Sequence, residues 1–182
     1  PYIKCKKGAK SGGIWEAETL ANLENATPDR SGNLIDNPSF GTGDSRSWIV
    51  RDKSRTEVVN NVVYSGNYSL ALYGDPNCYK SVVQFVKGAI VGGKDYYLSG
   101  ALSVEDKTTG YYLMQVRWYD VEGDELYANR TNYGRTGYNT EFVLNDLTLT
   151  APKNAVSAGV FLKANKADGV AYFDSLRLRV VK

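Results

Sequence analysis

Residues 111 to 120, Tyr-Tyr-Leu-Met-Gln-Val-Arg-Trp-Tyr-Asp, combine aromatic rings with amide and guanidinium groups. In a β-strand, successive side chains point to opposite faces of the sheet. One face of this stretch would be almost wholly apolar: Tyr112, Met114, Val116 and Trp118. The other would carry Leu113, Gln115, Arg117 and Tyr119. The first set suits a core, whereas the second offers rings and fixed donors to a polar, flat-faced ligand such as a sugar.

Other residues extend this polar face in the expected strand pattern. Tyr127 and Asn129 follow the turn at Glu122-Gly123, and Tyr97 has the same outward parity in what we expect to be a neighbouring strand. Tyr133 and Tyr138 lie in the loop that follows. Trp48 comes after a Gly/Ser/Asp-rich loop and fits either a core position or a stacking platform. The alternative is that all of them are ordinary surface residues of a Tyr-rich sheet.

The composition excludes several function classes. The chain of 182 residues has 22 Lys and Arg against 20 Asp and Glu, and it contains no His. The absence of His removes Ser-His-Asp and Cys-His catalysis and the commonest zinc sites. The one basic cluster, within residues 4–10, has the pattern of a solvated tail, so nucleic acid is not expected as a partner.

Catalysis by carboxylates is not expected either. A glycosidase needs two acids flanking a cleft, and the candidates lie mostly in apparent turns, where acids are common: Glu105, Asp106, Asp120, Glu122, Asp124 and Glu125. A lyase using Arg117 and Tyr119 would need a separate group to neutralise the uronate. We therefore expect a protein that is not an enzyme.

The element pattern is all-β and begins at Asn33. Short β-branched and aromatic runs alternate with Gly, Pro, Asn and Asp turns, which is typical of a β-sandwich or barrel. We expect an irregular N-terminal arm or linker at residues 1–32 and one β-sandwich module at residues 33–182. No apolar run approaches the roughly 18 residues needed to span a bilayer, so membrane insertion is not expected. Cys5 and Cys78 form a bridge or remain two separate thiols. The first residue is Pro1, not Met, and no signal peptide opens the chain, so we expect a processed or excised piece of a longer protein.

Five motifs, taken in order, resemble carbohydrate-binding modules of families 4, 16 and 22, which have a galactose-binding-like jelly roll. They are Asn33-Leu34-Ile35-Asp36-Asn37-Pro38-Ser39-Phe40 with Trp48 after it, Ser65-Gly66-Asn67-Tyr68-Ser69-Leu70, Gln84 before Gly93-Lys94-Asp95-Tyr96-Tyr97-Leu98-Ser99, Ala151-Pro152-Lys153-Asn154-Ala155, and Ala171-Tyr172-Phe173-Asp174-Ser175-Leu176-Arg177-Leu178. The resemblance spans residues 33–181.

The resemblance implies a jelly-roll β-sandwich of two antiparallel sheets, whose concave sheet binds a polysaccharide and which is attached to a secreted glycanase or lyase. It also implies a structural calcium held by Ser39, the carbonyl of Gly66 and Asp174. Gly41 departs from this pattern, because many members have an acidic residue there. The family's aromatic positions correspond to Trp48 and Tyr138.

We therefore predict a non-catalytic, extracellular carbohydrate-binding module. It would target an attached catalytic domain to a polysaccharide, with Arg117 compatible with an acidic glycan. The alternative is a cell-surface adhesion or assembly module of the same fold that binds a protein.

Overall fold

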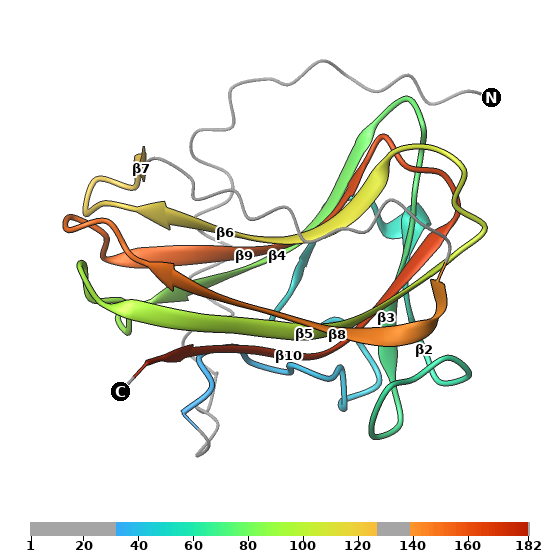
Figure 1. Ribbon diagram of the computed structural model, residues 1–182, viewed down its shortest axis with the longest axis horizontal. Coiled ribbons are helices and arrows are strands. Elements are labelled where there is room, and N and C mark those ends of the chain that lie inside the picture. The colour runs from blue at the N-terminus through green and yellow to red at the C-terminus, as the bar shows by residue number, and fades with distance from the viewer. Residues whose placement is uncertain (1–31, 127–138, 182) are drawn as a thin grey trace.

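The computed structural model describes residues 32–126 and 139–181. Two antiparallel sheets of five strands each lie face to face (Figure 1). Sheet A contains, in spatial order, β1 (Ile49–Val50), β4 (Tyr79–Lys87), β9 (Ser157–Asn165), β6 (Tyr111–Tyr119) and β7 (Glu125–Leu126). Sheet B contains β2 (Thr56–Val59), β3 (Ser69–Tyr73), β10 (Val170–Val180), β5 (Asp95–Glu105) and β8 (Asn139–Thr150). The expected all-β jelly-roll sandwich is confirmed.

Most neighbouring strands are distant in the sequence. β9 lies between β4 and β6, and β10 lies between β3 and β5. A 3-10 turn, η1 (Lys53–Arg55), joins β1 to β2 and begins after Asp52, whose side chain accepts a hydrogen bond from the backbone N–H of Ser54. No helix in the described part of the chain is long and apolar enough to cross a membrane.

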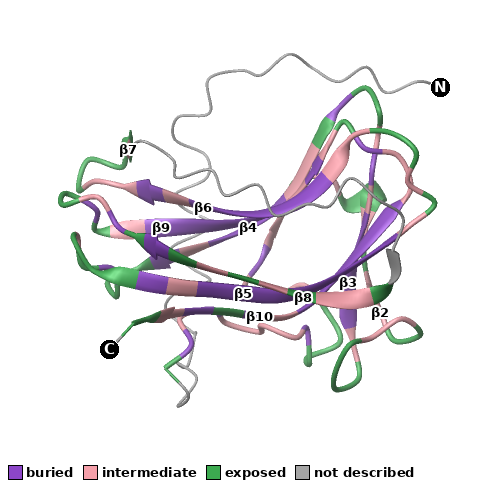
Figure 2. Ribbon diagram, viewed as in Figure 1, coloured by how far each residue is buried: buried purple, intermediate pink, exposed green. Residues whose placement is uncertain are grey.

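The core fills the space between the two sheets, where the strands are mostly buried (Figure 2). The apolar face predicted for residues 111–119 is part of it, because Tyr112, Met114, Val116 and Trp118 all belong to the main buried cluster. Trp118 of sheet A packs against Tyr96 of sheet B with their ring centroids 5.2 Å apart. The alternation in β6 thus fixes which of its faces points away from the core.

The start of the expected module is tied to its last strand. Asn33 Nδ2 donates to the carbonyl of Leu176 at 2.9 Å, and Asn33 Oδ1 accepts the backbone N–H of Leu178 at 2.9 Å. The boundary between residues 32 and 33 and the role of the arm stay predictions. Cys5 lies outside the described residues, so both alternatives for Cys5 and Cys78, a bridge or two separate thiols, stay as the sequence left them.

Candidate functional site

The outer face of sheet A forms a cavity of about 830 Å³. Leu113, Gln115 and Arg117, three members of the predicted polar face of β6, line it. Gln115 is only 3% exposed, so its amide lies on the floor of the cavity. The prediction that these three side chains share one face, away from the core, is confirmed.

The strand register brings residues of β9 and β4 beside those of β6. Across β6 and β9, Gln115 lies opposite Phe161 and Leu113 opposite Lys163. Two residues further along β9, Asn165 lies opposite Tyr111 of β6 on one side and opposite Tyr79 of β4 on the other. Tyr79 is 63% exposed. Together these three strands provide a floor with amide and cationic groups and, at one end, two tyrosine rings.

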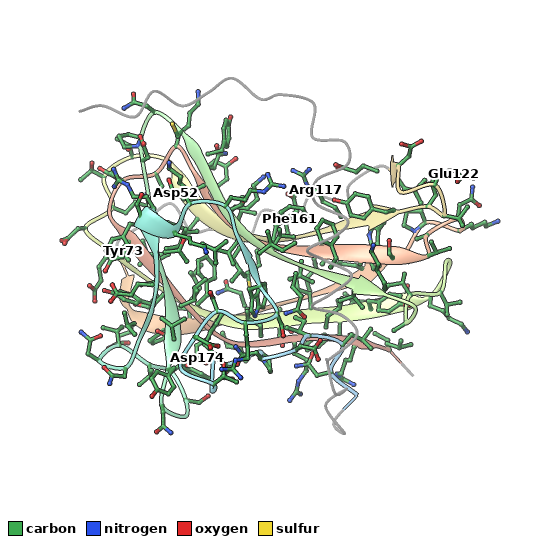
Figure 3. The ribbon with its side chains drawn as sticks, turned by 180° about the vertical axis from the view of Figure 1, so that it is seen from behind. Asp52, Tyr73, Arg117, Glu122, Phe161 and Asp174 are labelled. Atoms are coloured by element: carbon green, nitrogen blue, oxygen red, sulfur yellow. The ribbon has the colours of Figure 1, made fainter. Side chains whose placement is uncertain are left out.

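An aromatic cluster occupies the other end of this face. The ring of Phe85 meets those of Tyr119 and Phe161 edge-on, with centroid separations of 5.6 Å and 6.2 Å. Gly159 leaves room for them, because a Cβ there would lie 2.8 Å from Phe161 and 3.3 Å from Tyr119. The Arg117 guanidinium lies 4.7 Å from the ring centroid of Phe161, a cation–π contact. Figure 3 shows Arg117 and Phe161 next to each other on this face.

The polar groups of the floor form one network. Gln115 Oε1 accepts from Arg117 Nε at 3.2 Å and from Lys163 Nζ at 3.4 Å. Arg117 also donates through Nη1 to Glu125 Oε2 at 2.9 Å. This network holds the amide and the guanidinium in place before any ligand arrives, which lowers the entropy cost of binding.

Burial changes the proton affinities around the floor. Loss of solvation, with a further contribution from the positive charge of Arg117, lowers the pKa of Arg51. Burial, reinforced by the negative charge of Glu125, raises the pKa of Tyr119 to about 12. Tyr119 therefore remains a neutral phenol at ordinary pH and can donate a hydrogen bond.

The structure overturns two of the predicted site residues. Trp48 is 5% exposed, packs against Phe40 at 5.6 Å and belongs to the main core cluster, so it fills the core and does not offer a stacking surface. Tyr97 lies on β5 of sheet B, where its hydroxyl donates to Asp146 Oδ2 at 3.0 Å. Its outward parity was right, but β5 belongs to the opposite sheet, so Tyr97 does not join the cavity.

Four further predicted residues fall outside the described part of the chain: Tyr127, Asn129, Tyr133 and Tyr138. Tyr119 does lie on the predicted face, beside Phe85. The prediction missed Arg51, Phe161 and Lys163, which all line the cavity. Strict alternation in residues 157–165 indicates Phe161 and Lys163. Val160, Leu162 and Ala164, which alternate with these two residues, belong to the core.

The calcium site that the resemblance implies for Ser39, Gly66 and Asp174 stays a prediction, and hydrogen bonds already engage the Asp174 carboxylate. The Asp174 carboxylate is fully buried, and its Oδ2 accepts the backbone N–H groups of Tyr64 and Ser65, both at 2.9 Å. Its Oδ1 accepts the backbone N–H of Ser175 at 2.5 Å. These donors occupy most of the lone pairs that a cation would need. The described residues contain no group of three or more His, Cys, Asp or Glu arranged to hold a metal.

The Asp174 carboxylate joins the turn at residues 64–66 to β10. Ser65 Oγ and Ser175 Oγ also lie 2.6 Å apart. In Figure 3, Asp174 lies on the opposite side of the molecule from Arg117 and Phe161. The carboxylate is therefore a structural link that is separate from the cavity.

Known structures share this fold. The chain is 18% identical to the CBM22-1 xylan-binding domain from Paenibacillus barcinonensis Xyn10C, with a TM-score of 0.65 over 82% of this chain and 95% of that one. It is 20% identical to a structure described as Family 16 Carbohydrate Binding Module-2, with a TM-score of 0.63 over 82% and 100% of the two chains.

A viral protein shows the same similarity over a small part of its length. For the enzymatically active domain of tailspike protein 4 from bacteriophage CBA120, the identity is 16% and the TM-score 0.66, over 82% of this chain and 22% of that one. The chain thus spans less than a quarter of that protein. No protein-family model and no curated protein sequence matches the chain. What the comparisons establish is the fold: this chain has the jelly-roll sandwich found in carbohydrate-binding modules such as those of families 16 and 22.

Proposed function

We propose that this protein is a non-catalytic carbohydrate-binding module that holds a polysaccharide chain in the cavity on the outer face of sheet A. The observation that carries the proposal is the composition of that cavity. Tyr79 and Tyr111 offer rings to the C–H faces of sugars, while Gln115 and Arg117 offer donors to hydroxyls. A fold shared with xylan-binding modules supports the proposal but does not decide it.

The module would deliver an attached glycanase or lyase to its substrate outside the cell. One structure with the same fold contains CBM22-1 and GH10 modules of a Clostridium thermocellum endo-1,4-β-D-xylanase in one chain, at 14% identity and a TM-score of 0.58, over 79% of this chain and 27% of that one. That arrangement supports the attachment of a catalytic domain here. The extracellular location follows from the same role, because polysaccharides of this kind lie outside cells.

Affinity electrophoresis tests the proposal. Native gels are cast with xylan, mannan, β-glucan or an acidic glycan, and the protein is compared with Tyr79→Ala. We expect one class of glycan to retard the protein. The substitution should weaken that binding about five- to thirtyfold in Kd, because each stacked ring contributes about 1–2 kcal/mol.

Tyr64→Ala is the matched control, since Tyr64 is 47% exposed and sits in the turn held by Asp174, away from the cavity. It should leave the retardation unchanged. If no glycan retards the folded protein, the proposal is wrong, and capture of a protein partner through sheet A would favour the adhesion or assembly alternative.

A further inference from the structure

The described residues that line the cavity on sheet A include more cations than carboxylates. Among the described residues that line it, four are cationic and one is acidic: Arg51, Lys80, Arg117, Lys163 and Asp52. Lys80 is paired with Asp52 at 2.8 Å and, more distantly, with Asp75 at 3.9 Å. Arg117 is paired with Glu125 at 2.9 Å. Even with Asp75 and Glu125 included, cations outnumber carboxylates.

Two of these cations donate to the same amide oxygen, which carries no full charge. Arg117 Nε and Lys163 Nζ both donate to Gln115 Oε1, at 3.2 Å and 3.4 Å. An amide oxygen carries only a partial negative charge, so it adds no full counter-charge to the one that Glu125 supplies to Arg117. A ligand carboxylate or sulfate placed over this amide would meet both of them through charge-assisted hydrogen bonds.

A third cation approaches from the β1 side. Arg51 follows β1, whose register with β4 pairs Val50 with Val82. It lines the same cavity as Arg117, whose positive charge is one cause of the lowered pKa of Arg51. Partly buried like charges repel each other more strongly than they would in water. A bound anion would relieve this repulsion, whereas a neutral sugar would not.

Resting on the proposed function, we infer that the cavity prefers an acidic polysaccharide, and that Arg51, Arg117 and Lys163 select its carboxylate or sulfate groups. Tyr79 and Tyr111 would contact the sugar rings at the opposite end of the same face. Figure 3 shows Asp52, the partner of Lys80, well separated from Arg117 along this side of the molecule. The preference for anions therefore centres on Gln115, where Arg117 and Lys163 meet.

Titration calorimetry with matched glycans tests this inference. The carboxylate arm uses glucuronoxylan and polygalacturonate, each beside its carboxyl-reduced form. The sulfate arm uses dextran sulfate beside dextran. We expect an acidic glycan to bind at least about tenfold more tightly than its neutral counterpart. We also expect that advantage to shrink as NaCl is raised from about 50 to 500 mM, because the added salt shortens the screening length. The arm that shows the difference identifies the anionic group.

The double variant Arg51→Gln/Lys163→Gln should lose most of the preference, so that its affinities for the acidic glycan and for the matched neutral form differ by less than about threefold. Arg177→Gln is the control, because Arg177 is exposed on β10 of sheet B. Equal affinity for the acidic and neutral forms would overturn the inference and leave the proposed function standing. Failure to bind any of these glycans, together with no retardation in the gels above, would overturn both.

Discussion

Asp174 places a buried carboxylate where separate segments of the chain meet. The resemblance to families 4, 16 and 22 implies that it binds calcium. That role stays a prediction, and in this structure the carboxylate accepts backbone N–H groups from Tyr64, Ser65 and Ser175. Charge-assisted hydrogen bonds of this kind are about twice as strong as neutral ones. A carboxylate held by backbone donors can therefore link the 64–66 turn to β10 without a metal.

Replacing Asp174 by Asn should destabilise the protein by about 2–4 kcal/mol. The amide has one acceptor oxygen where the carboxylate has two, so partly buried N–H groups would lose their partners. Urea unfolding followed by circular dichroism measures the change. Asp146→Asn is the control. Asp146 is exposed, and its carboxylate accepts a hydrogen bond from the hydroxyl of Tyr97, which is not buried. A loss below about 0.5 kcal/mol for Asp174→Asn would show that the link contributes little.

Removing metal should leave stability unchanged. If backbone donors satisfy Asp174, dialysis against EDTA will not lower the melting temperature, and added CaCl₂ will not raise it. A fall of several degrees that CaCl₂ restores and MgCl₂ does not would instead establish a calcium site. Differential scanning fluorimetry measures both temperatures in one experiment.

At the scale of the element, β9 organises the cavity although no site residue was predicted in it. It lies between β4 and β6, and it contributes Phe161, Lys163 and Asn165 to the cavity. The same strand supplies Gly159, whose missing side chain leaves room for the rings of Phe85 and Tyr119. The geometry of the binding face therefore depends on one small residue in a central strand.

We expect Gly159→Ala to disturb the aromatic cluster. Its Cβ would come within 2.8 Å of Phe161, which would have to move and shift the Arg117 contact above it. Overpacking of this kind typically costs about 1–3 kcal/mol. Thermal unfolding measures the cost, and gel retardation should weaken several-fold. Gly41→Ala should change neither property, because no atom lies within 4 Å of its added Cβ. Unchanged binding by Gly159→Ala would mean that the cluster does not shape the site.

At the scale of the whole molecule, the two sheets depend on each other through their shared core. Trp118 of β6 is fully buried and packs against Tyr96 of β5, so this contact joins sheet A to sheet B. Trp118 also lies between Arg117 and Tyr119 in the sequence, and its burial turns those neighbours toward the outer face. The packing of Trp118 into the core therefore also sets the orientation of Arg117 and Tyr119.

Trp118→Ala should reduce the free energy of unfolding by about 3–5 kcal/mol, the usual cost of such a cavity. Urea unfolding monitored by circular dichroism should remain a single transition at a lower midpoint. Val121→Ala, at a residue that is 78% exposed, should shift that midpoint little. Two separate transitions in Trp118→Ala would show that the sheets unfold independently and would contradict this account.

Strand alternation alone determined a large part of this protein. It predicted the all-β class and assigned Tyr112, Met114, Val116 and Trp118 to the core and Leu113, Gln115 and Arg117 to the opposite face, because the period of side chains in a strand is local and strict. The same pattern was present in residues 157–165 and could have identified Phe161 and Lys163.

Only the tertiary structure decided which strands share a sheet. Tyr97 has the correct parity but belongs to sheet B, and Trp48 packs into the core; neither fact is encoded in local spacing. Likewise, the opposition of Gln115 to Phe161 comes from the pairing of strands whose paired residues lie 46 positions apart in the chain. Parity is a property of neighbouring residues, whereas sheet membership depends on the packing of the whole chain, which is why the first could be predicted and the second could not.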